Sequence, residues 1–484
     1  MSQQGLQSRP LERLRQCAPV QRFNQYIESP WFVLPVCLLT VCANLFGAEL
    51  YVYTAFILCG IYISLLGRDF LPLMSIVICC YIAPSTANNP GRNESSIFYP
   101  QNGGIYLAVL LAVLIGCILF RLATDPVIGG KAFLRKKRPL LPGMLVLGAG
   151  YLLAGAFSGR YSAHGINNLV FALVQFLSVF LMYWFFSGSV RWDRVRTDYL
   201  AWVCLGVGLT VCCELVGIFI SENVIVDNTI HTPLIASGWG NANNIGCMVA
   251  MMIPFAVDLS HRSRYGWLYS TIGVLMIGFV CFTCSRTSMF VAVLIYVISM
   301  VLALQDPRRR KDLLIANGVA GILLVTLLIF HGAVGQLFAE LIARGFNPRL
   351  RDIIFVDGFN AFLKKPIFGD SFYPGENSIY QWSTLESFRS ILPARWHNTI
   401  IQRLASCGIV GFGCYCFHRI QTIRLFWRRR RTDGVFIALS LMAMLMMSML
   451  DCHFFNVGPV LFYSMALAFA ENVFPATETT TASE

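Results

Sequence analysis

The sequence predicts an all-α protein: a polytopic bundle of about fourteen transmembrane helices with a large helical loop on the outer side of the membrane. Three observations predict this fold class. The chain of 484 residues is 56% hydrophobic and only 13% charged, with a mean hydropathy of +0.63. Apolar runs of about 20 residues, the length needed to cross a bilayer, follow one another closely. Most of the 37 lysine and arginine residues fall in alternate connections, which is typical of cytoplasmic loops.

The order of segments follows from these runs. Residues 1–30 form a cytoplasmic tail without the short apolar core of a removable signal peptide, in which 9–27 is either an interfacial helix or disordered. Eleven spans are expected in 31–333 and three in 398–472, and an acidic cytoplasmic tail occupies 473–484. The expected span centres lie near residues 39, 58, 77, 112, 149, 176, 209, 251, 275, 296, 322, 407, 442 and 462.

The connection 334–397 is expected to be a folded extracytoplasmic domain. It is about sixty residues long and rich in aromatic side chains, and long loops of this kind in compact proteins are usually functional when they are not disordered. Residues 351–365 have apolar side chains at helical spacing, two lysines at the end and Pro366 as a stop. This pattern predicts an amphipathic helix at the outer surface.

Cysteine usage and missing motifs exclude several classes of function. The 17 cysteines lie mostly in apolar runs, and none stands with histidines at zinc-ligand spacing, so we expect small buried side chains and not disulfides. There is no phosphate-binding loop or dinucleotide fingerprint, and we expect neither a metal nor a cofactor. The net charge of +12 is explained by orientation in the membrane, so no nucleic-acid partner is expected.

The stretch RWHNTIIQRLASCGIVG, residues 395–411, contains the first candidate site residue. On a continuous helix, His397, Gly408 and Gly411 share one face, where the two glycines would let a neighbouring helix approach closely. We expect this packing to hold the helix that presents the imidazole of His397 at the outer end of the span. Asn398 is a possible supporting residue. A histidine that merely sits in the interfacial belt is the alternative.

Arginines on the expected outer side are the second candidates. Arg286 lies between two apolar runs with no acidic residue nearby in sequence, so a bound anion is one possible partner and snorkelling to the interface is the other. Arg349 and Arg351 open the predicted loop helix and would add positive charge over the same surface. Ordinary solvated charges are the alternative for these two.

Polar residues at three further places are weaker candidates. Asn241 and Asn243, in the segment SGWGNANNIG, could bind hydroxyl groups or simply cap a helix. Glu214 is a carboxylate inside an expected span, and a functional role and a structural hydrogen-bonded role are equally consistent with the sequence. Asp451 and His453 lie near an outer helix end, where they could pair with an arginine.

Four of these elements, in this order, resemble the O-antigen ligase and polymerase family. His397-Asn398 followed by nine residues and Gly408-Ile409-Val410-Gly411 is similar to its HN-x9-GxxG pattern. Arg351 and Pro366-Ile367-Phe368-Gly369 resemble its outer-loop motif. Cys284-Ser285-Arg286-Thr287-Ser288 is similar to its Ser-Arg element, and Asn241-Ala242-Asn243 resembles Asn-Pro-Asn with alanine in place of proline. Asp370 stands where members often have another glycine.

The resemblance implies a metal-independent, inverting glycosyltransferase of the cytoplasmic membrane with a fold similar to the helical membrane (GT-C) glycosyltransferases. It would transfer glycan from a polyprenyl (undecaprenyl) diphosphate carrier to an acceptor hydroxyl on the outer face. His397 would activate the acceptor as a general base, and Arg286 and Arg351 would hold the diphosphate. Other envelope polysaccharide assembly proteins are possible partners.

Alternative functions remain open from the sequence. The acceptor could be a second lipid-linked glycan, a lipid core or a protein, so a polymerase and a ligase fit equally. A transporter of polysaccharide or lipid-linked glycan would also have many spans, although the sequence contains no clear internal repeat. A membrane scaffold without enzymatic activity would not require Arg286 or His397.

Overall fold

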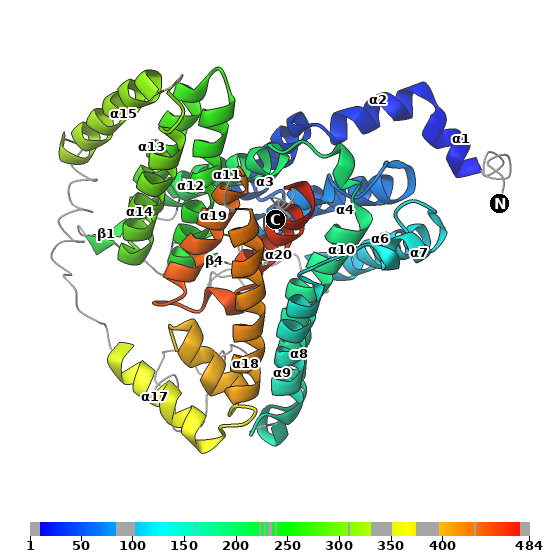
Figure 1. Cartoon of the computed structure of the whole chain (residues 1–484), viewed down its shortest axis with the longest axis vertical. Helices are drawn as coiled ribbons and strands as arrows, with labels where there is room; N and C mark the ends of the chain where they lie inside the picture. The colour runs from blue at the N-terminus through cyan, green and yellow to red at the C-terminus, as the bar shows by residue number, and fades with distance from the viewer. Residues whose placement is uncertain are drawn as a thin grey trace, which may run out of the picture. The chain divides into compact units, whose positions relative to one another are not determined.

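The computed structural model describes residues 10–83, 102–159, 161–221, 224–226, 229–230, 235–237, 240–307, 310–330, 351–373, 396–429 and 432–474. These ranges are almost entirely helical (Figure 1), and the prediction of an all-α membrane-helix fold is confirmed. The chain divides into two compact units. Unit 1 comprises Met1–Lys137, Phe186–Ser285 and Tyr296–Leu337, and unit 2 comprises Arg138–Phe185, Arg286–Ile295 and Phe338–Glu484.

Helices make up most of the described part of the chain. The first half of the chain forms α1 (Pro10–Gln16), α2 (Ala18–Ile27), α3 (Val33–Phe46), α4 (Glu49–Leu66), α5 (Leu73–Ile82), α6 (Gly104–Thr124), α7 (Gly130–Arg135), α8 (Leu141–Phe157), α9 (Tyr161–Phe176), α10 (Met182–Ser189) and α11 (Tyr199–Ser221). The second half forms α12 (Ala242–Arg262), α13 (Gly266–Phe282), α14 (Arg286–Ala303), α15 (Arg310–Phe330), α17 (Arg351–Lys364), α18 (Thr399–Arg428), α19 (Gly434–Met447) and α20 (Val457–Val473).

A helix lies at each of the fourteen expected span centres, but their lengths differ. Among the described residues, seven helices are long and apolar enough to cross a membrane, and a bent pair, Ala18–Ile27 with Pro30–Phe46, would make an eighth. Five more apolar helices have only 10–17 residues. A ten-residue helix such as α5 rises about 15 Å, half the thickness of the hydrocarbon core. Fourteen complete spans therefore stay a prediction.

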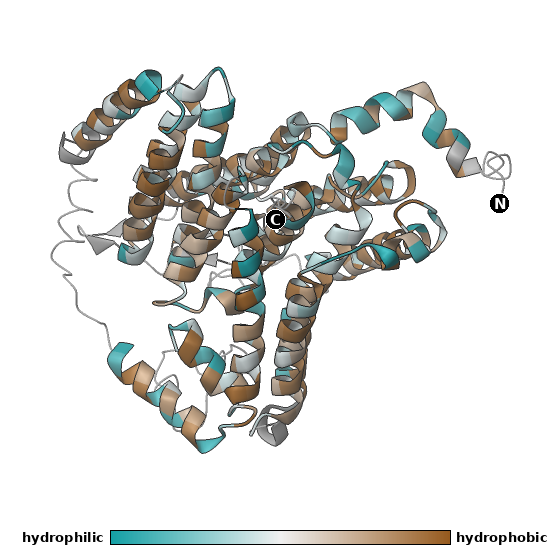
Figure 2. Ribbon diagram, viewed as in Figure 1, coloured by the Kyte–Doolittle hydropathy of each residue, from teal (hydrophilic) through white to brown (hydrophobic). Residues whose placement is uncertain are grey.

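The distribution of apolar side chains on the surface is that of a membrane protein. Figure 2 shows hydrophobic residues along most of the length of the helices and hydrophilic ones mainly at helix ends and in α1 and α2. Outside the face that packs against α4, helix α6 exposes large apolar side chains, among them Ile105, Val109 and Leu119. In water so large an apolar surface would be unfavourable, whereas lipid tails solvate it.

Unit 1 is built around α12, whose residues from Asn244 to Ser260 are all buried. Helices α11 and α13 pack against it. At its C-terminal end, Asp258 and Arg262 form an ion pair of 2.7 Å one helical turn apart. Two short antiparallel hairpins precede α12: β1 (Ile225–Val226) pairs with β2 (Thr229–Ile230), and β3 (Ala236–Ser237) pairs with β4 (Gly240–Asn241).

Unit 2 is organised by α8, α9, α18 and α20. Helix α8 packs against both α9 and α18. Small residues allow the close contact between α8 and α18, since a Cβ atom on Gly150 would lie only 2.9 Å from the Cβ of Cys414 and 3.5 Å from the Cα of Gly411. Gly411 therefore lies at a helix-helix contact of the kind expected from the sequence.

Helix α18 is interrupted at Gly408, which has φ 62° and ψ −166°. The chain changes direction at this point (Figure 1), so the residues before and after Gly408 are two helical segments. The second segment, 409–428, is about 30 Å long and matches the hydrocarbon thickness, whereas the first, 399–407, rises only about 13 Å. His397 and Gly411 are consequently not on one continuous helix face, so the sequence prediction of a shared face is wrong. Gly408 allows the helix to break and does not provide a helix-helix contact.

The segment after α17 supplies the backbone hydrogen bonds that the break removes. In a continuous helix Ile409 N would donate to Ala405 O. Here the bonds run to the segment 366–370: Ile409 N donates to Pro366 O (2.8 Å), Val410 N donates to Ile367 O (3.2 Å), and Asp370 N donates to Ala405 O (2.8 Å). Gly369, with φ 82°, makes the approach possible, because a Cβ there would lie 2.5 Å from Cys407 N. The PIFG and GIVG sequences thus form one structural element.

Helix α17, Arg351–Lys364, occupies the position of the expected loop helix. It packs against the first segment of α18 through Ile354, Ala361, Trp396, Ile401 and Ala405. Gly358 makes the packing close, because a Cβ on it would lie 2.5 Å from the Trp396 ring and 2.6 Å from the Ile401 side chain. The rest of the expected loop domain, 334–350 and 374–395, lies outside the described residues.

The variant Gly408→Ala is expected to lower the free energy of unfolding by about 2 kcal/mol or more, because the positive φ is unfavourable for alanine and its methyl group would overlap the backbone of Ile367. Thermal unfolding of the purified protein in detergent measures the effect. Gly413→Ala is the matched control: Gly413 is an exposed residue of the same helix, and a Cβ added to it would meet nothing within 4 Å. Equal unfolding midpoints for the two variants would contradict the role given to Gly408.

Candidate functional site

His397 is held at the start of α18 by its neighbour Asn398. The Asn398 side-chain oxygen accepts hydrogen bonds from Ile400 N (2.8 Å) and Ile401 N (3.1 Å), which makes it the N-cap of the helix. Its Nδ2 donates to Met449 O (2.8 Å), and Thr399 N donates to Ser448 O (2.8 Å). These bonds join the turn that carries His397 to the segment that follows α19.

The backbone of His397 is strained. Its φ is 47°, which lies in the left-handed region. Residues other than glycine, asparagine and aspartate rarely occupy this region. Cys284, with φ 53°, is the other non-glycine residue with positive φ in the described part of the chain, and it lies two residues before Arg286. Such conformations cost about 1–3 kcal/mol each and cluster at functional sites. Both therefore draw attention to the segments that the sequence singles out.

Asp451 lies beside the imidazole of His397, with 3.4 Å between its Oδ1 and the histidine Nδ1. The Asp451 side chain is only 6% exposed, and its Oδ1 also accepts a hydrogen bond from Cys452 N (2.7 Å). The histidine side chain is 28% exposed. Nδ1 of His397 has no hydrogen-bond partner among the described residues, so Asp451 acts on it through its charge. A carboxylate charge near Nδ1 favours a proton on that nitrogen and leaves Nε2 as the basic atom. The pair has the composition of a general base and its orienting group.

Gln402 fixes the other side of the same turn. Its Oε1 accepts a hydrogen bond from Trp396 N (3.0 Å) and contacts the Cys452 thiol at 3.1 Å, and its Nε2 donates to Ser406 Oγ (3.1 Å). Trp396 itself is buried against α17. The residues on both sides of His397 are therefore immobilised, and the imidazole is presented from a rigid turn.

The candidate arginines lie at helix starts. Arg351 is the first residue of α17, about 10 Å along the axis from Gly358, the point at which this helix packs against α18. Arg286 is the first residue of α14, after a buried turn in which Ser285 N donates to Thr283 Oγ1 (3.3 Å). Both side chains are half-buried. Arg349 lies outside the described residues.

Unit 2 contains Arg286, Arg351, His397 and Asn398, whereas Asn241, Asn243 and Glu214 belong to unit 1. Asn243 is half-buried in the first turn of α12. Glu214 is buried in α11, where its side chain accepts a hydrogen bond from Asn44 of α3. This contact gives Glu214 a partner between two helices. The convergence of the imidazole with the two guanidinium groups stays a prediction.

Arg403, which sequence reasoning counted only as a charge within a span, is fully buried. Its Nη2 donates to the Tyr151 hydroxyl at 2.5 Å. Three aromatic rings surround its guanidinium, with ring centroids at 4.0 Å (Tyr151), 4.7 Å (Phe455) and 5.3 Å (Tyr415). Its Nε and Nη1 have no hydrogen-bond partner among the described residues. Cation–π contacts thus accommodate this charge. No carboxylate in the described part of the chain forms an ion pair with it.

Arg419 extends the same cluster from the second segment of α18. Its guanidinium lies 4.0 Å from the Phe454 ring centroid and 4.9 Å from that of Tyr415, and it donates to the Tyr463 hydroxyl at 3.2 Å. Tyr415 therefore lies near both guanidinium groups, which come from opposite sides of the break at Gly408. The sequence signal that could have identified this cluster is Arg403, because an arginine within an apolar run is a functional candidate by default.

No group of three histidine, cysteine, aspartate or glutamate side chains within the described ranges gathers as a possible metal site. The strong positive groups of unit 2 are arginines instead. Arginine is suited to phosphate because its planar guanidinium forms two parallel hydrogen bonds to phosphate oxygens. The chemistry that this composition supports is acid–base work at His397 and anion binding at arginines.

Comparison with known proteins identifies a similar family for part of the chain. Residues 271–416 match the family model described as O-antigen ligase. The matched range includes Arg286, Arg351, His397 and the glycine pair of α18, and it does not include Asn241 or Asn243. No curated protein matches the chain. This part of the chain is therefore similar to O-antigen ligases, and the helices of the described residues include seven that are long and apolar enough to cross a membrane.

Replacement of Arg403 tests how its charge is accommodated. Arg403→Met keeps the volume and removes a buried charge that has no carboxylate partner in the described part of unit 2, so we expect an unchanged or higher unfolding temperature. Arg403→Lys keeps the charge but loses the planar stacking, and we expect a lower unfolding temperature. Thermal unfolding of the three purified proteins under one detergent condition gives the order. A methionine variant less stable than the lysine variant would contradict the expectation that this buried charge is unfavourable.

Proposed function

Because residues 271–416 match the O-antigen ligase family, we propose that the protein transfers a glycan from a polyprenyl diphosphate carrier to an acceptor hydroxyl on the outer face of the cytoplasmic membrane. The observation that carries the proposal is the pair of His397 and Asp451, 3.4 Å apart at a strained turn before α18. A partly exposed imidazole oriented by a buried carboxylate is a common solution for deprotonating a hydroxyl group.

The reaction is a single displacement at the anomeric carbon. The acceptor oxygen forms a bond to this carbon while its proton passes to Nε2 of His397. The bond between the anomeric carbon and the diphosphate oxygen breaks, and the diphosphate leaves with the electron pair. One displacement inverts the configuration at the anomeric carbon. The reaction needs no metal where cationic side chains stabilise the leaving group.

In this proposal Arg286 and Arg351 bind the diphosphate. Each begins a helix, and the free N–H groups of a first helical turn add to the attraction for an anion. Asn398 supports the site by capping α18, so its role is to position His397. Contacts of Asn241, Asn243 and Arg349 with the glycan are a further part of the proposal, and Glu214 is assigned to helix packing on the basis of its bond to Asn44.

The positive-inside pattern supports the orientation. Arginines of the chain gather in the N-terminal helices and in the connections that contain Arg68, Arg191 and Arg262, which the rule assigns to the cytoplasm. The turn of His397 lies one membrane-length segment away from the basic end of α18 at Arg428. This separation supports a transferase site on the outer face. Polymerase and ligase differ in the acceptor alone, and both use the residues named here.

His397→Ala is expected to lower glycan transfer by about 10²- to 10⁴-fold, because the acceptor hydroxyl loses its general base. The measurement is the glycan profile of a deletion strain complemented with each variant, together with the amount of protein in the membrane. His261→Ala, at the end of α12 in unit 1, is the matched control. Normal glycan with the His397 variant would refute the catalytic role. Completed polymer accumulating inside the cell would indicate a transporter instead.

Asp451→Asn is expected to lower kcat by at least about tenfold while the KM for the lipid-linked donor stays unchanged. The reason is that Asp451 orients the imidazole and makes no contact with the donor in this mechanism. Steady-state kinetics of the purified protein in lipid nanodiscs measure both constants. An increase in KM with unchanged kcat would show that Asp451 serves donor binding and not the orientation of His397.

A further inference from the structure

Unit 1 contains a cavity of about 310 Å³ that is lined by four arginines and a single carboxylate. The arginines are Arg15, Arg68, Arg121 and Arg191, and the carboxylate is Asp125. We refer to it as the arginine cavity. Its volume falls at the lower end of the range typical of small-molecule sites. Nothing in the transferase proposal uses this cavity.

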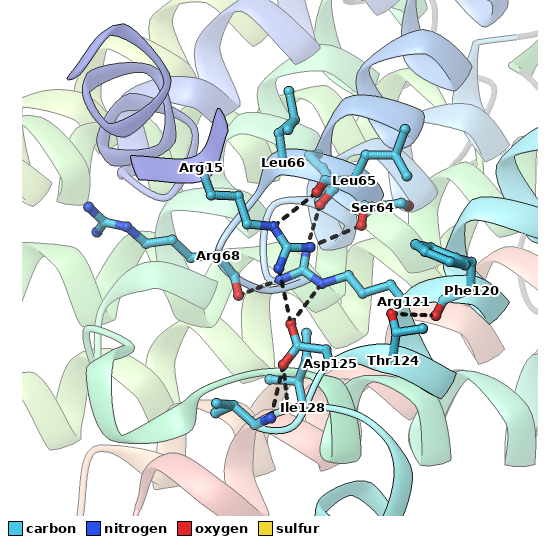
Figure 3. Close-up of polar contacts among 12 residues, drawn as sticks. Arg15, Ser64, Leu65, Leu66, Arg68, Phe120, Arg121, Thr124, Asp125 and Ile128 are labelled. Carbon is cyan, nitrogen blue, oxygen red and sulfur yellow. Dashed lines mark hydrogen bonds and ion pairs between the residues drawn. The ribbon is translucent and has the colours of Figure 1, made fainter. Parts of the chain in front are cut away.

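Arg121 lines the arginine cavity, and hydrogen bonds and an ion pair hold its side chain in place (Figure 3). Its side chain is 2% exposed and donates to Ile63 O (2.7 Å) and Arg68 O (2.6 Å) at the end of α4. Asp125 is already engaged by its neighbours, because its Oδ1 accepts from Val127 N (2.9 Å) and its Oδ2 lies 3.4 Å from Arg121 Nε and 3.6 Å from Arg15 Nη1. One carboxylate is thus shared by two arginines, and positive charge remains in excess.

Arg191 and Arg68 carry most of this excess. Both also line a neighbouring cavity of about 220 Å³, together with Arg194, Arg196, Glu28 and Asp69. Arg194 and Arg196 are paired with Asp193 and Asp198. Nε of Arg191 is buried and has no hydrogen-bond partner among the described residues. The Arg68 guanidinium reaches one carboxylate, Glu28, at 3.2 Å. A buried guanidinium nitrogen without an acceptor is unfavourable, and an anion in the cavity would supply one.

The carboxyl groups of Glu28 and Asp69 near Arg191 offset part of this charge. Burial raises the pKa of Asp69, and burial together with the charge of Asp69 raises the pKa of Glu28. Both groups therefore ionise less readily than free carboxylates. The Oδ2 of Asp69 accepts the backbone N–H of Arg191 (3.1 Å), so its hydrogen bond positions the chain and leaves the guanidinium available.

The edge of the arginine cavity is formed by two helices suited to a membrane surface. Helices α1 and α2 contribute Arg15, Gln21 and Asn24 to the lining. They are tied to the end of α4 by Arg15 Nε to Leu65 O (3.0 Å) and Asn24 Nδ2 to Leu66 O (2.9 Å). They also expose large apolar side chains, including Leu14, Phe23 and Tyr26. Amphipathic helices of this type lie in the interfacial region among lipid headgroups.

We propose that the arginine cavity binds a phosphate-bearing anion, with the phosphate between Arg68 and Arg191. Two sources share this chemistry, the headgroup of an anionic phospholipid and free inorganic phosphate. The apolar side chains of α1 and α2 favour the lipid, because acyl chains would lie along them while the headgroup enters the cavity. Basic pockets at the cytoplasmic ends of transmembrane helices bind anionic lipids elsewhere by the same forces.

The experiment measures thermal unfolding of the purified full-length protein in neutral detergent. It compares added phosphatidylglycerol, phosphatidylcholine and inorganic phosphate, at matched ionic strength. The proteins are the natural one, Arg68→Gln, Arg191→Gln, the variant with both glutamine substitutions, and Arg191→Lys. We expect phosphatidylglycerol to raise the unfolding temperature of the natural protein. We expect apparent lipid affinity to fall about fivefold with either glutamine variant and roughly 25-fold with both together.

Arg264→Gln is the matched control. Arg264 is an exposed arginine of unit 1 that does not line the cavity, and its guanidinium donates a hydrogen bond to the Tyr265 hydroxyl. It removes the same charge and should leave the response to lipid unchanged. Arg191→Lys keeps the charge and guards against misfolding, and it should retain part of the response. A response to inorganic phosphate that depends on Arg68 and Arg191 would support the site and identify free phosphate as its source. No response of the natural protein to either anion, or equal responses in all variants, would overturn the proposal.

Discussion

The junction between the Pro366–Asp370 segment and the break in α18 is the interaction on which unit 2 depends. A backbone N–H or C=O without a partner costs several kcal/mol in hydrocarbon, so a transmembrane helix does not interrupt its ladder unless other groups replace the bonds. The three backbone bonds to residues 366–370 are that replacement. Two glycines with positive φ, Gly369 and Gly408, permit the approach. The break lets a short helical segment carry the turn of His397 and still leaves a full-length second segment.

Positive charge is accommodated in three different ways within the apolar helices. Arg121 is satisfied mainly by backbone carbonyl oxygens at the end of α4. Arg262 forms an ion pair with Asp258 one turn away. Arg403 is enclosed by aromatic rings and keeps two nitrogens without hydrogen-bond partners in the described part of unit 2. The first two arrangements neutralise or solvate the guanidinium locally, whereas in the third the faces of aromatic rings take the place of a carboxylate.

The sequence was sufficient to locate the helices, because apolar runs of membrane length are long-range signals that do not depend on tertiary contacts. It also identified the helix Arg351–Lys364 from periodicity and the stop at Pro366. It could not predict the break in α18. A GxxG pair reads equally well as a helix-packing motif, and only the contact with residues 366–370 distinguishes the two. That contact joins segments about forty residues apart and depends on close approach of two backbones.

The partner of His397 was beyond sequence reasoning for a related reason. Asp451 lies more than fifty residues further along the chain and reaches the imidazole only because the cap at Asn398 and the bond from Thr399 N to Ser448 O bring the two turns together. A histidine alone at a helix start has no preferred tautomer, and an aspartate alone at a helix end is an ordinary polar residue. Only their adjacency, with 3.4 Å between the Asp451 Oδ1 and the His397 Nδ1, suggests the roles proposed for them. The backbone of His397 keeps its positive φ between the cap at Asn398 on one side and the bond from Trp396 N to Gln402 on the other. These tertiary contacts hold a conformation that an isolated turn would abandon.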